Sequence, residues 1–367
     1  MNEQRACLLL ARAPGVTAEH VRAAVAELGE LERIVDPQSA SRCRALPERA
    51  RTFLRTPDED CIESDLRSLA KLGARAIACT SAHYPPLLAQ TDGAPAVLYV
   101  LGDVTALAAP QLAMVGARSA TAGGRATAGE FAEAFARSRL AVTSGLAAGI
   151  DAASHEGALA GGGLTIAVCA HGLDRIYPPE HRRLAERIRS QGALLTELPP
   201  GTPARREFFP QRNRIISGLA LGTLVVEAAR QSGSLITARC AARQGRKVFA
   251  VPGSIRNVLS RGCHQLIREG AKLVESAQEV LSELEIHFVQ QVLALPEIGP
   301  HGSPARARPL DKDYEMLLDA VDFEPVSVNT LVERTGLPSG SVASMLLILE
   351  LEGRIAPHPG GCYCRLS

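Results

Sequence analysis

A repeated order of apolar segment, small-residue turn and helical pattern runs through the middle of this chain. The apolar segments lie at 112–115, 140–145, 164–172, 222–228 and 246–254. Near-continuous apolar strands of this kind are typical of a sheet that is buried on both faces. Because the strands alternate with helices, the sequence predicts an α/β fold with a doubly wound, mainly parallel sheet.

The turns that follow these strands carry small residues, and arginine lies beside them. In parallel sheets, ligands bind beyond the carboxyl ends of the strands, where helix N-termini attract anions. Arginine can add a bidentate contact to phosphate. Glycine after a strand can also be ordinary turn chemistry, but several such turns on one edge favour an anion site. The turn residues are Gly116, Arg118, Ser144, Gly145, Ser232, Gly233 and Ser234.

The first turn does not match the known nucleotide-binding motifs. Its sequence, GARSATAGG, lacks the G-x-G-x-x-G of dinucleotide-binding folds, and the chain contains no G-K-[ST] of ATP-binding loops. The cysteines are scattered, without a CxxC pair or metal-ligand spacing. The sequence therefore supports no NAD or ATP chemistry, no cofactor and no metal site.

A second basic segment follows Pro210. Arg212, Asn213 and Arg214 start a helical pattern there, and both arginines are expected to face a site at the helix end. The helix dipole disfavours cations at an N-terminus, so an anionic partner would relieve that cost. The alternative is a solvated helix start, with an arginine paired to a carboxylate.

Residues suited to acid–base chemistry also lie near the predicted site. Asp151 and His155 are four residues apart on one helix face, and they fit either a general acid–base pair or a satisfied polar pair near the site. The second interpretation is favoured. Glu227 ends a predicted strand and is the better catalytic candidate by position, but no Ser/His/Asp set completes a mechanism around it.

Composition limits the classes of partner. The net charge is only +1, and the chain has no Trp and few aromatic residues. A broad base-stacking platform is therefore not expected, and any nucleic-acid binding should depend on phosphate contacts. The N-terminus lacks a signal pattern and no apolar run reaches membrane-spanning length, so a soluble, cytoplasmic protein without a membrane partner is expected.

The chain divides into four predicted parts. Residues 1–75 read as short helices, and the turn at Pro14 and Gly15 resembles SAM-like modules that bind DNA backbones or serve packing. Residues 76–285 form the main α/β domain, with edge strands added at 76–110. A Pro- and Gly-rich linker is expected at 286–312. Residues 313–367 read as three helices and a hairpin, a winged-helix pattern whose third helix has no basic residue, which favours protein contact over groove binding.

These segments together resemble the DNA-processing protein A family, DprA, also called Smf. The resemblance rests on MVGAR, TSGLAAGIDAASHEGAL, TIAVCAHGLDRIYP, FPQRNRIISGL, VVEAARQSGSLITARCAARQGRKVFAVPG and GCHQLIREGAKLV, in order through 114–274. It implies an extended Rossmann-like fold that binds single-stranded DNA without hydrolysing it. It also implies protection of incoming strands in natural transformation, loading of RecA onto them, and a homodimer.

The resemblance also implies roles for particular residues. Gly116 and Arg118 would hold a backbone phosphate, with Ser144 and Gly145 lining the same pocket. Arg212 and Asn213 would complete it together with Ser232, Gly233 and Ser234. The dimer-forming region would include His264, Ile267 and Leu273. Two positions depart from the family pattern: Ala148 stands where many relatives carry a basic residue, and His264 where many carry Asn.

Two other functions remain open. The wider fold superfamily contains phosphoribohydrolases, and Glu227 with the Ser-Gly-Ser turn is faintly similar to their signature, although P-G-G-x-G-T is missing. The chain would then be a nucleotide-processing enzyme. Alternatively, the terminal domains would do the main work in a protein-interaction scaffold, and DNA contact would be incidental.

Overall fold

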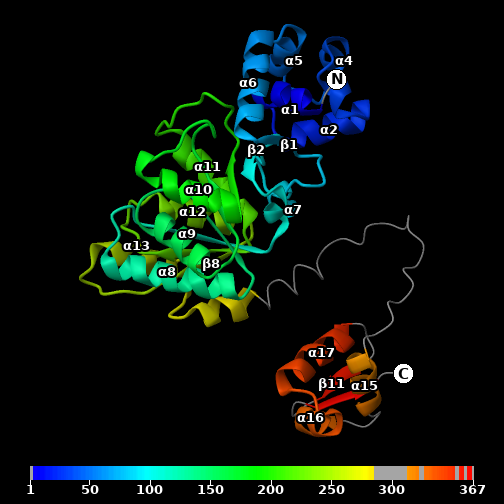
Figure 1. Cartoon of the computed structure of the whole chain (residues 1–367), viewed down its shortest axis with the longest axis vertical. Coiled ribbons are helices and arrows are strands. Elements are labelled where there is room, and N and C mark those ends of the chain that lie inside the picture. Colours follow the sequence, from blue (N-terminus) through cyan, green and yellow to red (C-terminus); the bar gives the residue numbers. More distant parts are fainter. Residues whose placement is uncertain (1–2, 285–311, 322–325, 352–354, 359–361, 366–367) are drawn as a thin grey trace. The chain divides into compact units, whose positions relative to one another are not determined.

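The computed structural model places the chain in two compact units, Met1–Leu295 and Pro296–Ser367. Each unit is described by itself (Figure 1). The structure describes residues 3–284, 312–321, 326–351, 355–358 and 362–365. The predicted linker at 286–312 lies outside the described residues except for Lys312.

Short helices form the start of the first unit. Thr17 begins α2, as predicted, and its hydroxyl accepts a hydrogen bond from the backbone N–H of His20. Gly29 ends the same helix. The helices are α1 (Glu3–Arg12), α2 (Ala18–Leu28), α3 (Leu31–Ile34), α4 (Pro37–Arg42), α5 (Glu48–Arg55) and α6 (Glu59–Leu72).

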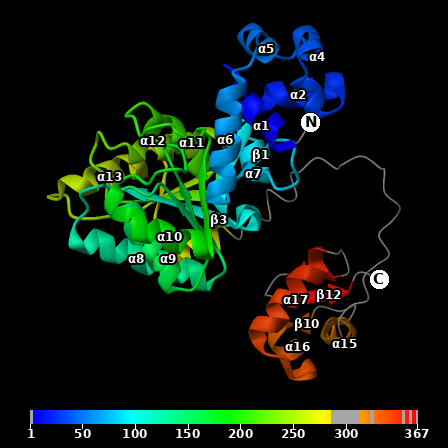
Figure 2. The same ribbon diagram turned by 45° about the horizontal axis from the view of Figure 1, so that its top comes forward.

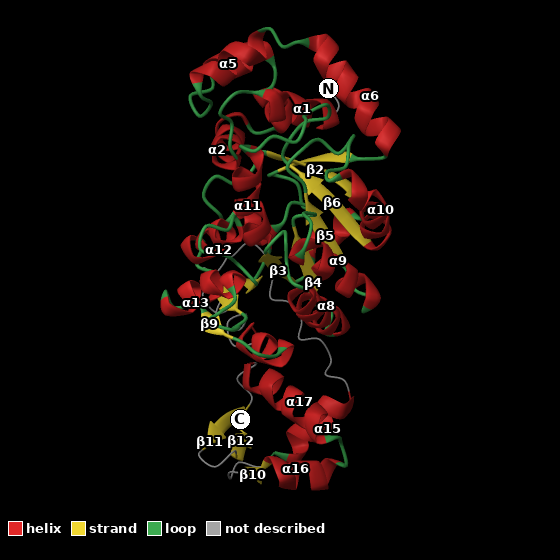
Figure 3. Ribbon diagram, turned by 90° about the vertical axis from the view of Figure 1, so that its left-hand side faces the viewer, coloured by secondary structure: helices red, strands yellow, loops and turns green. Residues whose placement is uncertain are grey.

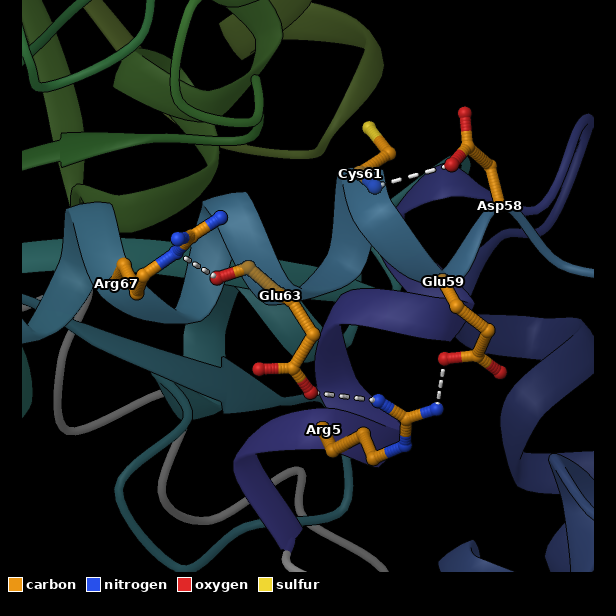
Figure 4. Close-up of polar contacts among 6 residues, drawn as sticks. All are labelled: Arg5, Asp58, Glu59, Cys61, Glu63 and Arg67. Carbon is orange, nitrogen blue, oxygen red and sulfur yellow. Dashed lines mark hydrogen bonds and ion pairs between the residues drawn. The ribbon is translucent and has the colours of Figure 1, made fainter.

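Ion pairs tie α6 to α1. Arg12 donates two hydrogen bonds to the Asp65 carboxylate, at 2.6 and 2.9 Å, and Asp65 is only 3% exposed. Nearer the solvent, Arg5 contacts Glu59 and Glu63, as Figure 4 shows. One apolar core continues from these helices into the sheet. The predicted boundary at residue 75 therefore lies inside one compact unit, and the division into separate domains there stays a prediction.

A mixed sheet of nine strands organises the rest of the first unit. Its order is β1-β2-β6-β5-β4-β3-β7-β8-β9, parallel from β6 to β9, with β1 and β2 antiparallel at one edge. The predicted doubly wound, mainly parallel sheet is confirmed, and the reading of the sequence missed β6. The strands are β1 (Arg75–Ala78), β2 (Val97–Gly102), β3 (Gln111–Gly116), β4 (Ala141–Ser144), β5 (Thr165–Val168), β6 (Gly192–Thr196), β7 (Gly222–Val226), β8 (Lys247–Ala250) and β9 (Lys272–Leu273).

Helices cover both faces of this sheet (Figures 2 and 3). One face carries α8 (Ala122–Arg137), α9 (Ile150–Ala160) and α10 (Arg182–Gln191). The other carries α11 (Phe208–Leu219), α12 (Ser234–Arg243) and α13 (Arg261–Arg268). Shorter connecting elements are η1 (Val104–Ala108), η2 (Pro179–His181), η3 (Val258–Ser260) and α7 (Pro86–Ala89).

The strand order reverses between β3 and β7. From β3 the chain builds outward through β4 and β5 to β6, and then returns through α11 to place β7 on the other side of β3. The helices after β3 and β7, α8 and α12, lie on opposite faces, so a crevice opens at the carboxyl ends of these two strands. In folds of this class, ligands bind at such a point.

The second unit has the predicted winged-helix pattern. A three-stranded sheet packs with three helices around one small apolar core. Its elements are α15 (Lys312–Ala320), β10 (Val326–Ser327), α16 (Val328–Thr335), α17 (Ser339–Leu351), β11 (Ile355–His358) and β12 (Cys362–Arg365). In neither unit does a described helix have the length and apolar character needed to cross a bilayer.

Replacing Arg12 by Ala should destabilise the first unit, because it leaves the buried Asp65 carboxylate unpaired. We expect the free energy of unfolding to fall by about 3 kcal/mol, measured by urea denaturation. Arg5→Ala is the matched control, since its partners Glu59 and Glu63 are more than half exposed and such pairs contribute about 1 kcal/mol or less. Equal losses in the two variants would contradict this account.

Candidate functional site

A hollow of about 800 Å³ lies at the point where the strand order reverses. We call it the main hollow. It is lined by the turn after β3, the first half of α11 and the turn before α12. The structure thus brings together residues that are far apart in the sequence. The predicted residues that line it are Gly116, Arg118, Arg212, Asn213, Ser232, Gly233 and Ser234.

The side chain of Arg212 is buried in the wall of the main hollow. The residue is 5% exposed, and its Nε atom has no hydrogen-bond partner among the described residues. Burial lowers the pKa of Arg212, and the negative charge of nearby Asp151 opposes that shift. A buried guanidinium with an unsatisfied donor is unfavourable unless an anion accompanies it. The main hollow is therefore suited to an oxyanion.

Gly145 makes room for this arginine. A Cβ atom at Gly145 would lie 1.6 Å from Nη1 of Arg212, so the guanidinium can lie there only over a glycine. Gly145 also lines a small adjoining hollow of about 110 Å³ together with Arg118. Ser144 lines neither hollow: it is fully buried, and its hydroxyl donates to the Met114 carbonyl oxygen at 2.6 Å.

The expectation that both arginines of the QRNR segment face a helix-end site is wrong. The helix begins at Phe208, so Arg212 lies in its second turn. Residues two apart on a helix point in different directions. Arg214 instead forms a 2.6 Å ion pair with Glu197. Arg212 thus reaches the main hollow from the side of α11, and the helix dipole is not the reason for its position.

An aromatic pair lies at the edge of the main hollow. The exposed Arg118 guanidinium lies 4.9 Å from the centre of the Phe209 ring, and Phe209 meets Tyr177 edge-on at 6.0 Å. Tyr177 is 47% exposed. Reasoning from composition argued against a broad stacking platform and did not single out this pair. The sequence offered one positional signal for this pair: Tyr177 and Phe209 each stand directly before a proline.

The start of α12 is open toward the main hollow. The N-cap residue Gly233 has no side chain, the Ser232 hydroxyl accepts from the Ser234 N–H at 3.3 Å, and a Cβ atom at Gly233 would meet nothing within 4 Å. Asn213 donates to the Gly233 carbonyl oxygen at 3.3 Å, and the hydroxyls of Ser232 and Ser234 are 2.6 Å apart. The N–H groups of Leu235 and Ile236 donate to the carbonyl oxygens of Ser232 and Gly233, so an anion here would meet the serine hydroxyls rather than a set of free helix N–H groups. Asn213 thus positions the predicted serine turn for such a contact.

The start of α8, in contrast, is already occupied. Glu227 accepts hydrogen bonds from the Thr121 backbone N–H at 2.8 Å and from its hydroxyl at 2.6 Å. The expected contribution of the α8 N-terminus to the anion site is therefore corrected, because the chain's own carboxylate lies there, while Gly116 and Arg118 of the same turn line the main hollow. The same contacts give Glu227 a structural role in place of the catalytic role considered from its position.

Gly116 is a glycine for a packing reason. A Cβ atom there would lie 1.9 Å from the Val226 carbonyl oxygen and 2.5 Å from Ile150. The close approach of β3, β7 and α9 thus accounts for the missing side chain, whether or not an anion lies near it. The interpretation of the small turn residues as part of an anion site applies better to Gly233, which faces open space.

Asp151 and His155 have separate partners. Asp151 accepts from the Ala147 N–H at 3.2 Å and lines the main hollow, so it lies near the site as expected. The Nδ1 atom of His155 lies 2.7 Å from the Thr165 hydroxyl, and the residue is fully buried. The polar pair favoured from the sequence is therefore replaced by two separate contacts, and a neutral buried imidazole is poorly suited to acid–base work.

The predicted dimer residues lie apart from the main hollow. His264 and Ile267 are partly buried on α13, and the Nε2 atom of His264 is 3.0 Å from the Gly253 carbonyl oxygen. Leu273 is 43% exposed in β9, the last strand of the sheet. Among the described residues, no group of three or more His, Cys, Asp or Glu side chains could hold a metal ion.

Comparison with known sequences gives consistent matches. The sequence model of the family described as DNA recombination-mediator protein A matches residues 75–285, and that of the DprA winged helix domain matches residues 301–361. Protein Smf of Escherichia coli is 41% identical, over 93% of this chain and 89% of its own length. DNA processing protein DprA of Streptococcus pneumoniae is 46% identical, over 55% of this chain and 71% of its own.

Solved structures agree with these matches. The X-ray structure of DNA processing protein A from Streptococcus pneumoniae superposes with a TM-score of 0.67 at 36% identity, covering 77% of this chain and 99% of that one. A structure concerned with the single-stranded DNA binding mode of the Helicobacter pylori protein superposes with a TM-score of 0.52 at 25% identity, covering 60% and 95%. Both similarities support the Rossmann-like fold class.

The buried imidazole of His155 should make stability depend on pH. Burial lowers its pKa from 6.5 to about 3. As the pH falls below 6.5, the unfolded chain therefore binds a proton that the folded protein does not, and the free energy of unfolding falls by about 1.4 kcal/mol per pH unit. In His155→Gln this loss should be absent, giving a shallower slope between pH 6.5 and 5 in urea denaturation. Equal slopes would contradict the assignment, since His171, whose pKa burial also lowers, contributes equally to both proteins.

Proposed function

The chain belongs to the DNA recombination-mediator protein A family, and from that premise we propose that it binds single-stranded DNA through the main hollow and loads RecA onto it. The protein would thereby protect incoming strands during natural transformation. The observation that carries the proposal is the buried Arg212, whose Nε atom lacks a partner among the described residues. In this proposal, the anion that accompanies Arg212 is a backbone phosphate of the DNA.

The walls of the main hollow suit one phosphate and its neighbouring bases. Arg212 supplies a buried guanidinium, and Arg118 supplies an exposed one at the rim. The hydroxyls of Ser232 and Ser234 at the start of α12 add neutral hydrogen-bonding groups. Phe209 and Tyr177 offer ring faces and edges to bases, a contact that tolerates any sequence. Gly145 and Asn213 would act indirectly, by positioning Arg212 and the serine turn.

We propose binding without turnover. Glu227, the strongest catalytic candidate from the sequence, uses its carboxylate to hold Thr121. His155 is buried with a pKa of about 3, so it is neutral near pH 7 and not available as a general acid. These two observations speak against the phosphoribohydrolase-like alternative.

The finer parts of the proposal concern assembly and place of action. A homodimer through His264, Ile267 and Leu273 is supported by the exposed Leu273 side chain on an edge strand. Edge strands with exposed apolar residues readily pair with another chain. Action on DNA together with RecA implies a cytoplasmic protein.

Arg118→Ala should weaken single-strand binding. The side chain is exposed, so folding should be unaffected, while one phosphate contact is lost. We expect the Kd for a labelled single-stranded oligonucleotide to rise about tenfold, and the slope of log K against log salt to become shallower by about 0.7. Fluorescence anisotropy over a salt series measures both. Arg137→Ala, an exposed arginine at the far end of α8, is the control.

Several outcomes would change the proposal. Undiminished binding by Arg118→Ala would exclude the main hollow as the DNA site. No binding by the unmodified protein at low salt, together with release of free base from a nucleoside monophosphate that Glu227→Gln abolishes, would establish the enzyme alternative. RecA loading is tested with the same variants, as RecA-dependent ATP hydrolysis on strands coated with single-strand binding protein. Equal stimulation by Arg118→Ala and the unmodified protein would separate RecA loading from this site.

Leu273→Asp should produce monomers, because it places a charge on the proposed apolar interface. Sedimentation velocity over a range of concentrations measures the change. Leu164→Asp is a matched control, since Leu164 is similarly exposed at 38%, beside the start of β5. Dimers that persist in Leu273→Asp, or monomers in the unmodified protein, would exclude this interface.

A further inference from the structure

The main hollow continues into further hollows along the outward face of α12. Ile236 lines both the main hollow and a second one of about 470 Å³, which is bounded by Arg239, Ala242 and Arg243. Arg239 and Ala242 also line a third hollow of about 550 Å³. We call this third one the distal hollow. The three hollows thus share lining residues along α12, from its start to the region beyond its end.

The face of α12 along this depression is basic. Ile236, Arg239 and Arg243 are three and four residues apart, so they form one stripe on the helix. Arg239 and Arg243 are both exposed. Within the described part of the chain Arg239 has no hydrogen bond or ion pair, and Arg243 contacts only the sulfur of Cys240, at 3.4 Å. Neither guanidinium is neutralised by a carboxylate there.

The distal hollow repeats the feature that marks the main hollow. Arg246 is 7% exposed, and its Nε atom has no partner among the described residues. One of its other nitrogens donates to the Leu87 carbonyl oxygen at 3.1 Å. As with Arg212, a buried guanidinium is left with an unsatisfied donor, here in the wall of the distal hollow.

The charge around the distal hollow remains positive after its ion pairs are counted. Lys247 and Lys272 both contact Glu283, at 2.7 and 2.5 Å, and these two contacts lower the pKa of Glu283 to about 2. Glu269 is the other acidic residue in the lining, and it accepts from Gln265. The lining of the distal hollow thus contains four basic side chains and two acidic ones, so it favours an anion over a cation. The basic residues are Arg239, Arg246, Lys247 and Lys272, and the acidic residues are Glu269 and Glu283.

We propose that the DNA strand leaves the main hollow along α12 and that a second backbone phosphate binds in the distal hollow. This path rests on the proposed function. The ten residues of α12 span about 15 Å at about 1.5 Å per residue, which is enough for a few nucleotides between the two buried arginines. Arg239 and Arg243 contact the phosphates between them. The path is electrostatic and tolerates any base sequence.

The path is tested by the dependence of affinity on strand length. Arg239→Ala/Arg243→Ala should bind an oligonucleotide of about 20 nucleotides about tenfold more weakly than the unmodified protein, with a salt slope shallower by about 1.4, or about 0.7 for each lost contact. Binding of a trinucleotide, which fills only the main hollow, should be unchanged at low salt. Arg118→Ala should weaken both. Anisotropy with labelled oligonucleotides measures all of these.

The matched control is Arg183→Ala/Arg187→Ala. This is also an exposed pair of arginines four residues apart, on α10, which covers the other face of the sheet (Figure 3). It should bind both oligonucleotides like the unmodified protein. An equal loss in the two double variants would reduce the effect to net charge and overturn the path.

The remaining outcomes separate this inference from the proposed function. If the unmodified protein binds both oligonucleotides and Arg239→Ala/Arg243→Ala does the same, the path is overturned while the main hollow stands. If the unmodified protein binds neither, the proposed function itself fails and the path fails with it. Loss of trinucleotide binding in the double variant would also overturn the path, because the arginines would then act on the main hollow.

Discussion

The contact between the Arg212 guanidinium and the bare backbone of Gly145 is the arrangement on which the site depends. It places a permanent positive charge where a side chain at residue 145 would otherwise lie. Asp151 provides a nearby negative charge, but the Nε atom of Arg212 still lacks a partner in the described structure. A charge held in this way is unfavourable until an anion accompanies it, and the reversal of strand order between β3 and β7 opens the hollow in which an anion can do so.

The fold could be predicted well from the sequence because its signals are local. Apolar strands, glycine turns and proline-bounded helices each lie within about ten residues, and together they predicted the parallel sheet. β6 was missed for a physical reason: it begins at Gly192, directly after α10 ends at Gln191, with no turn between them. The start of α11 was placed too late because Pro210 was taken as a boundary, although proline is tolerated within the first turn of a helix.

The site was only partly predictable, because its geometry depends on contacts between distant segments. The sequence could indicate that Arg118, Arg212 and the serine turn lie on one edge. It could not indicate that Arg214 turns away to Glu197, or that Glu227 reaches across to Thr121. The aromatic pair was missed because composition describes how many rings a chain has, whereas position decides whether two of them meet.

Glu227 gives the crevice between β3 and β7 two unequal sides. On the side of α8, the helix terminus is closed by a carboxylate of the chain itself, while at the start of α12 the Ser234 N–H meets only the neutral Ser232 hydroxyl. In the proposed complex, a phosphodiester would therefore have a carboxylate near one flank of the crevice and neutral hydroxyl groups near the other. A single strand has a chemical direction, and a symmetric cradle would accept it either way round. Under the proposed function, the internal carboxylate would add to the asymmetry of the crevice and so favour one 5′-to-3′ direction of a bound strand.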